Sequence, residues 1–272
     1  FKKAFPDRFF DCGIAENNMI AAAVGMSLCG KIPFASSFAM FAAGRSFEQV
    51  RNAIGYPHNN VKIGATHAGI TVGEDGATHQ CNEDIALMRT IPGMIILNPA
   101  DDTEARLAVK AAIEHDGPVY LRFGRMAVPV YYGADYEFKI GKGVKMADGN
   151  DVALIATGIE VEQALIAREL LAADGISASV VNISTIKPLD EELVVAEATR
   201  CGCVVTCEEH NIIGGLGGAV CECLSEKKPT PVLRVGVQDV FGRSGPAKEL
   251  ISYFGLDAAS IAAKAKAAIA LK

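Results

Sequence analysis

Short apolar, β-branched runs alternate with amphipathic stretches along the chain, first up to about residue 126 and again from about residue 151. This alternation is typical of βαβ units stacked on a parallel sheet. We therefore predict an α/β protein of two three-layer αβα domains with mostly parallel sheets. Strands are expected at residues 32–37, 61–66, 94–97, 119–123, 151–156, 179–183, 203–207 and 232–235. Helices are expected at residues 14–28, 45–54, 83–90, 103–114, 159–173 and 190–199, after Gly218 and at the carboxyl end, with Asp102 as a helix N-cap.

Residues 127–150 lose this periodicity and collect glycine, proline and tyrosine, as is typical of a connection between domains. A chain of 272 residues, half of them hydrophobic, also suits two cores better than one. The predicted boundaries are residues 1–128 for the first domain, 129–149 for the linker and 150–272 for the second domain.

Charge and cysteine content narrow the class of protein. The chain has 26 basic and 32 acidic side chains, a balance that gives no footprint for nucleic acid. No apolar run approaches the roughly 20 residues of a bilayer span, and the charged start lacks a signal-peptide core. The eight cysteines form no CxxC pair, which fits a reducing cytosol. We expect a soluble, cytoplasmic protein without nucleic-acid or membrane partners, whose gene begins before Phe1.

The densest polar cluster lies in residues 66–80, between a predicted strand and the next helix. Ligands bind at the carboxyl ends of strands in open α/β sheets. His67, Asp75 and His79 can donate hydrogen bonds and exchange protons near neutral pH, so a ligand site is favoured here over a structural turn. Their spacing matches no strong metal signature, and no metal ligand is predicted.

Other features have an ordinary structural interpretation when each is taken alone. Glu16, at the start of an apolar helix, suits the positive helix terminus. Phenylalanines at 34, 38, 41 and 47 are more often core residues than a surface for stacking a flat heterocycle. Five cysteines between residues 201 and 223 are interpreted as core packing and not as zinc ligands. The glycines of residues 214–218 serve either close packing or an anion at a helix start.

Seven segments together resemble the carboxyl-terminal half of transketolase, in order and spacing, over essentially the whole chain. The segments are FKKAFPDRFF, DCGIAENNM, PFASSFAMFAAGRSFEQVR, ATHAGITVGEDGATHQ, VYLRFGRM, STIKPLDEEL and EEHNIIGGLGGAV. Between Ala42 and Ser46 the spacing is shifted by one residue from the family's pattern.

The resemblance implies a thiamine diphosphate enzyme of the pentose phosphate pathway type, which moves a two-carbon ketol unit from a ketose phosphate to an aldose phosphate. Members have three α/β domains, and this chain would supply the pyrimidine-binding and carboxyl-terminal ones. Nothing in it resembles the segment that holds the diphosphate and Mg²⁺ or another divalent ion. A partner chain would supply that domain, in a heterotetramer containing a homodimer of this chain.

The resemblance also assigns roles to residues. Glu16 matches the glutamate that activates the cofactor through the aminopyrimidine nitrogen, for which burial would have to raise its pKa. Phe41 matches the ring that stacks on the aminopyrimidine, and Phe38 lines that pocket. The residues that match substrate-binding positions are His67, Asp75, His79 and Arg125. His79 is also expected to be catalytic. Arg125 would bind the sugar phosphate, and Arg122 is the competing candidate for that role.

Three alternatives remain open from the sequence. Deoxyxylulose phosphate synthase shares the cofactor and several motifs, but normally lacks a histidine at the position of His67 and has Ala-Asp-Gly in place of Glu74-Asp75-Gly76. The β subunit of 2-oxo-acid dehydrogenases shares the two-domain architecture, but the two histidines suit sugar hydroxyls better. The third alternative is a non-catalytic, partner-binding paralogue that keeps the fold.

Overall fold

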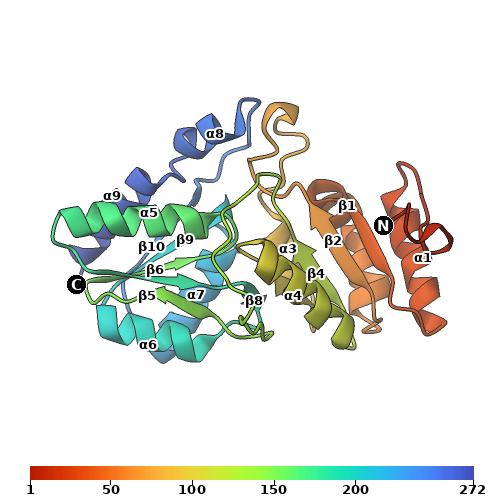
Figure 1. Cartoon of the computed structure of the whole chain (residues 1–272), viewed down its shortest axis with the longest axis horizontal. Helices are drawn as coiled ribbons and strands as arrows, with labels where there is room; N and C mark the ends of the chain where they lie inside the picture. The colour runs from red at the N-terminus through yellow and green to blue at the C-terminus, as the bar shows by residue number, and fades with distance from the viewer.

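The computed structural model describes residues 1–272 and contains two five-stranded sheets side by side (Figure 1). Four strands of each sheet are parallel and one edge strand is antiparallel, which confirms the predicted α/β class. The first sheet has the order β1 (Phe34–Phe38), β2 (Lys62–Thr66), β4 (Val119–Arg122), β3 (Ile95–Leu97) and β8 (Thr185–Lys187). The second has the order β10 (Val232–Val237), β9 (Val204–Asn211), β6 (Val152–Ala156), β7 (Ala178–Asn182) and β5 (Val144–Ala147).

Helices cover both faces of the first sheet because its strands present apolar side chains alternately to either side. Ile96 and Tyr120 point into one core, whereas Leu97 and Leu121 point into the other. The first core is closed by α1 (Glu16–Leu28), the π-helical turns η2 (Met40–Arg45) and η3 (Val50–Gly55) with α2 (Phe47–Gln49) between them, and α3 (Asp84–Arg89). The second is closed by α4 (Asp102–Glu114). Short 3₁₀ turns are η1 (Pro6–Arg8) and η4 (Gly73–Asp75).

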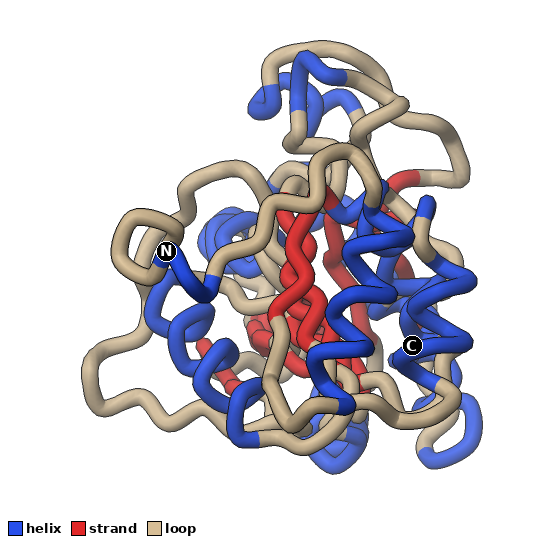
Figure 2. The backbone as a smooth tube through the Cα atoms, turned by 90° about the vertical axis from the view of Figure 1, so that its right-hand side faces the viewer, coloured by secondary structure: helices blue, strands red, loops and turns tan.

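The second sheet is enclosed in the same way. Figure 2, viewed from the side of the first domain, shows strands running between helices. One face packs against α5 (Glu160–Ala173), α8 (Ala247–Tyr253) and α9 (Ala258–Ile269), and the other against α6 (Glu191–Cys201) and α7 (Leu216–Lys227). Cys203 and Cys207 lie in the first of these cores, Cys201 and Cys223 in the second, and Cys221 is half-buried. This confirms core packing for four of the five cysteines.

Two strands differ from the sequence expectation. β5 lies within residues 129–149, where a linker is expected, and pairs antiparallel with β7. β8 follows directly after the second sheet's β7 but joins the first sheet, pairing antiparallel with β3. The apolar signal is weak for both, because β5 is only partly buried and β8 has three residues.

Helix termini correct one expectation and decide another that the sequence left open. The N-cap of α4 is Asp101 and not Asp102: its side chain accepts a hydrogen bond from the Glu104 amide at 2.7 Å. An anion does lie at the glycine-rich start of α7: it is the carboxylate of Glu208. This carboxylate accepts hydrogen bonds from the backbone N–H groups of Leu216 at 2.6 Å and Gly217 at 2.8 Å. Among all the helices, none combines the length and apolar character that crossing a bilayer requires.

Candidate functional site

The candidate site lies where the parallel strands of the first sheet end. Phe38 is the last residue of β1, His67 follows β2 and Arg125 lies just beyond β4, and these three strands are neighbours in the sheet. A cavity of about 620 Å³ opens beside them. It is lined by Gly13, Ile14, Glu16, Ser37, Phe38, Phe41, Arg45, Thr78 and His79. The fold thus brings Glu16, Phe38, Phe41 and His79 to one cavity.

Glu16 is the first residue of α1, and its side chain is only 8% exposed. Arg45 Nη1 donates to Glu16 Oε2 at 2.8 Å, from the end of η2. Burial raises the pKa of Glu16, but hydrogen bonds from its own backbone amide, Arg45 and Ser37, with the charge of Arg45, outweigh burial and leave the pKa below its ordinary value. The expected raised pKa is therefore wrong for the chain by itself.

Aromatic rings form one wall of the cavity. Phe38 and Phe41 are nearly parallel, at 13°, with centroids 6.1 Å apart. His67 stacks on Phe38 at 3.9 Å, and His79 meets the Phe41 ring edge-on at 5.3 Å. Both phenylalanines line the cavity and neither packs against the first core, so core packing, the interpretation favoured by their spacing alone, is wrong for them. Phe47 does pack against the core.

The loop after β2 places the remaining candidate residues around His67. His67 has φ +56°, a left-handed conformation that is rare outside glycine and often found at functional sites. Burial lowers the pKa of His67, the charge of Arg125 lowers it further, and Asp75 opposes both, so these two charged groups lie within electrostatic reach of the imidazole. Arg125 Nη1 donates to the Val72 carbonyl at 2.7 Å, while Asp75 is exposed in η4.

The second domain holds this loop from behind. Glu209 Oε1, on β9, accepts the amide of Thr71 at 2.7 Å. A Cβ on Gly69 would lie 2.2 Å from the Glu209 carboxyl carbon, so the loop can approach this closely only because it has glycine there. Buried Gln80 donates to the carbonyls of Ile70 and Arg243, both at 2.9 Å, and links the loop to the segment before α8.

Arg122 is not available to bind a ligand. Its side chain is 3% exposed, its Nε donates to Asp84 Oδ2 at 2.8 Å, and its Nη2 donates to the Glu209 carbonyl at 2.8 Å. Arg125, with 47% of its side chain exposed, can turn toward a ligand. Arg125 donates to the Val72 carbonyl and lies 3.5 Å from Glu74 Oε2, so of the two arginines considered from the sequence it is the one exposed enough to reach a phosphate.

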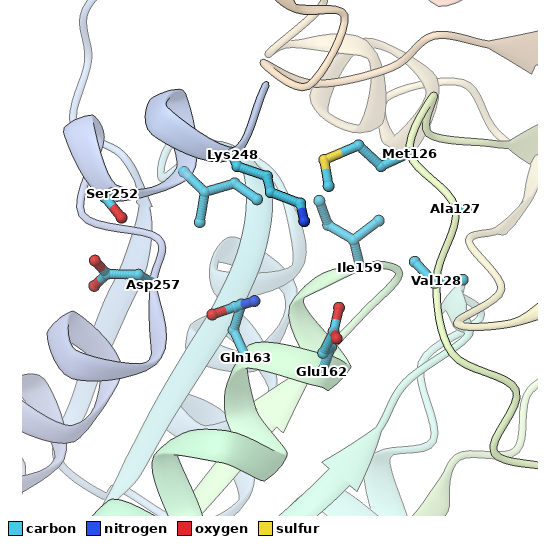
Figure 3. Close-up of a pocket in the computed structure, with 10 residues that line it drawn as sticks. Met126, Ala127, Val128, Ile159, Glu162, Gln163, Lys248, Ser252 and Asp257 are labelled. Carbon is cyan, nitrogen blue, oxygen red and sulfur yellow. The ribbon is translucent and has the colours of Figure 1, made fainter. Parts of the chain in front are cut away.

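A second cavity of about 270 Å³ lies between residues 126–128, α5 and α8 (Figure 3). Lys248 and Glu162 point toward it from opposite helices. No residue predicted for the site lines this cavity, so it is separate from the first one.

Sequence reasoning missed Ser37, Arg45 and Thr78. Arg45 had a signal of its own, because it is the one charged residue between Lys31 and Glu48. The π-helical turn η2 covers the place where the spacing is shifted by one residue. A π turn takes up one residue more than an α turn, and this irregular segment ends with Arg45 at the cavity.

Comparisons with known proteins agree along the whole chain. Family models match for the pyrimidine-binding domain of transketolase over residues 1–130 and the C-terminal domain of transketolase over residues 141–261. A Methanocaldococcus jannaschii protein provisionally named transketolase C-terminal section is 52% identical, covering 96% of this chain and 83% of its own. A 6-deoxy-6-sulfo-D-fructose transketolase subunit from Clostridium sp. (strain MSTE9) is 44% identical over 96% of this chain and 81% of its own.

A solved structure, described as an inactive β4 tetramer of a split-gene transketolase, has a TM-score of 0.94 and 51% identity. It covers 100% of this chain and 88% of that chain. Two αβα domains, with a cavity at the strand ends of the first sheet, place the chain in the α/β class. Within that class, the matches show the particular family: this chain belongs to the transketolase family.

Proposed function

We propose that this chain is the carboxyl-terminal subunit of a thiamine diphosphate-dependent transketolase. It would transfer a two-carbon ketol unit from a ketose phosphate to an aldose phosphate, and only together with a chain that binds the diphosphate. The observation that carries the proposal is the cavity that unites Glu16, Phe38 and Phe41 with His79.

The residues present fit the pyrimidine end of this cofactor. A flat heterocycle needs an aromatic surface, and Phe38 and Phe41 supply half-buried, nearly parallel rings. A ring nitrogen needs a polar partner, and the Glu16 carboxyl stands at the same cavity. Volumes of about 300 to 1,000 Å³ are usual for small-ligand sites. The nucleophilic carbon for ketol transfer comes from thiamine diphosphate when it is bound.

Glu16 would hold a proton on its carboxyl toward the pyrimidine ring nitrogen. His67 and His79 would donate to, or accept from, the hydroxyl and carbonyl oxygens of the sugar near the reacting carbon. Asp75 would accept from a sugar hydroxyl at the outer side of the loop. Arg125 would bind the sugar phosphate, since its planar guanidinium donates in pairs to phosphate oxygens.

The partner chain would supply what this chain does not offer. No cluster of three or more His, Cys, Asp or Glu side chains is arranged here to hold a metal ion, so the Mg²⁺ of the diphosphate is assigned to the partner. Two copies of each chain would form the assembly, since twofold pairing is the commonest closed arrangement. All eight cysteines are free thiols, which suits the reducing cytoplasm.

The test is to mix this chain, extended to its natural start, with a candidate diphosphate-binding chain and to follow ketol transfer between pentose phosphates. Glu16→Gln in the mixture should lower turnover by about 100-fold or more, because the amide cannot exchange the proton. Glu48→Gln is the matched control, since Glu48 is exposed on α2 and bonds only its neighbours Gln49 and Asn52. It should leave turnover unchanged.

The other outcomes are equally informative. Activity from this chain alone would contradict a split enzyme, and full turnover by Glu16→Gln would remove Glu16 from its role. An assembly that keeps thiamine diphosphate but turns over no sugar phosphate would favour the inactive paralogue.

A further inference from the structure

Arg45 connects the two features on which the candidate cofactor pocket depends. Its Nη1 lies 2.8 Å from Glu16 Oε2, and its guanidinium carbon lies 4.5 Å from the centroid of the Phe41 ring. Glu16 is the acid of the pocket, and Phe41 is the ring expected to stack on the ligand. One side chain thus engages both.

A guanidinium group is flat, delocalised and rich in N–H donors. It can stack on an aromatic ring with its plane and pair with a carboxylate through its edge. An aminopyrimidine ring asks for the same two contacts: a flat aromatic face and a carboxyl at its edge. Two flat groups cannot occupy one place between Glu16 and Phe41.

We propose that Arg45 occupies the place of the aminopyrimidine ring in the cofactor-free chain, and that cofactor loading displaces it. The inference rests on the proposed function. Arg45 is suited to leave, because 47% of its side chain is exposed and it hydrogen-bonds only to Glu16. Arg45 thereby keeps the buried Glu16 carboxylate paired until the cofactor arrives. It also competes with the cofactor for the same place.

Displacement changes the proton balance of the pocket. The groups that face Glu16 are its own helix amide, Arg45 on η2 and the hydroxyl of Ser37 on β1, with His79 across the cavity. Burial raises the pKa of Glu16, and its own amide and Ser37 lower it, whether or not Arg45 is present. Once Arg45 leaves, its hydrogen bond and its charge no longer lower the pKa of Glu16 as well. When the cofactor binds near pH 7, the protein should therefore take up a maximum of one proton. This proton is the one that Glu16 needs for its proposed role.

The experiment titrates thiamine diphosphate with Mg²⁺ into the assembled complex by calorimetry at pH 7, in two buffers of different ionisation enthalpy. Arg45→Met should bind on the order of tenfold tighter, since it removes an ion pair and a cation–π contact that compete with the ligand. It should also take up fewer protons, because its Glu16 is already more protonated before binding. Arg45→Lys keeps the charge without the flat group. Its affinity and its proton uptake should lie between those of the wild type and Arg45→Met.

Arg51→Met is the matched control. Arg51 is exposed in η3 and donates only to its neighbour Asn52, so affinity and proton uptake should equal those of the wild type. Melting temperatures of all variant complexes show whether each one folds.

If the wild type binds and Arg45→Met binds equally or more weakly, this inference is overturned while the proposed function stands. Weaker binding would mean that Arg45 stays beside Glu16 and helps to hold the ligand. If neither complex binds the cofactor, the proposed function fails and the inference fails with it.

Discussion

Glu209 is one of the residues through which the second domain supports the loop of the candidate site. Only one of its carboxyl oxygens has a partner, the Thr71 amide, and the side chain is fully enclosed. Burial raises the pKa of Glu209 to about 7, although Arg122 and the amide hydrogen bond oppose the change. The folded protein therefore binds a proton between about pH 4.5 and 7 that the unfolded chain does not.

The stabilisation from this proton is complete below about pH 4.5 and is lost as the pH rises through 7. We expect Glu209→Gln to remove this dependence, because a neutral amide of the same shape does not titrate. The wild type should lose on the order of 3 kcal/mol of unfolding free energy relative to the variant between pH 5 and pH 8. Urea denaturation at several pH values measures this difference in unfolding free energy. Glu226→Gln is the control, since Glu226 is exposed. Parallel curves for wild type and Glu209→Gln would contradict the raised pKa.

At the residue scale, the sequence predicts which side chains meet better than it predicts their charge state. The motifs of the family are the reason that a shared cavity could be predicted for Glu16, Phe38, Phe41 and His79. The pKa of Glu16 depends on Arg45, which is 29 residues away in the chain. The sequence marks Arg45 as an isolated charge, but its contact with the Glu16 carboxylate depends on how the π-helical turn η2 ends.

Asp101 shows how an element's start is decided by tertiary contacts. Asp101 and Asp102 are adjacent and chemically equal, and either could cap α4. Asp101 is chosen because its second oxygen also accepts the amides of Tyr131 at 2.7 Å and Tyr132 at 3.0 Å, from the segment between the domains. Periodicity predicts β4 and β6 for a related reason: they are buried on both faces, whereas β5 and β8 lack that signal.

Asp101→Ala should therefore cost more than an ordinary cap. Loss of the cap costs about 1 kcal/mol, and two further amides lose their acceptor, so we expect a total of about 2 to 4 kcal/mol in unfolding free energy. Asp102→Ala removes only an exposed pair with Arg106 and should cost under about 0.5 kcal/mol. Equal losses in the two variants by chemical denaturation would contradict Asp101 as the cap.

The whole molecule is tied together by β8, which leaves the second domain to complete the first sheet. Lys187, at its end, donates to the carbonyls of Arg89 and Ile91, both at 2.7 Å. The backbone N–H of Asn98, after β3, donates to the Ser184 carbonyl at 2.7 Å. Neither domain can unfold without breaking a sheet or a buried hydrogen bond of the other.

We therefore expect one cooperative transition for the full chain in differential scanning calorimetry, with equal calorimetric and van't Hoff enthalpies. Lys187→Met should lower the unfolding free energy by about 1 to 3 kcal/mol, because two carbonyls lose a charged donor. Exposed Lys228→Met is the control and should leave the transition in place. Because β8 pairs within the first sheet but continues directly from β7 of the second sheet, two resolved transitions in the wild type would mean that β8 contributes little to the stability of the first domain.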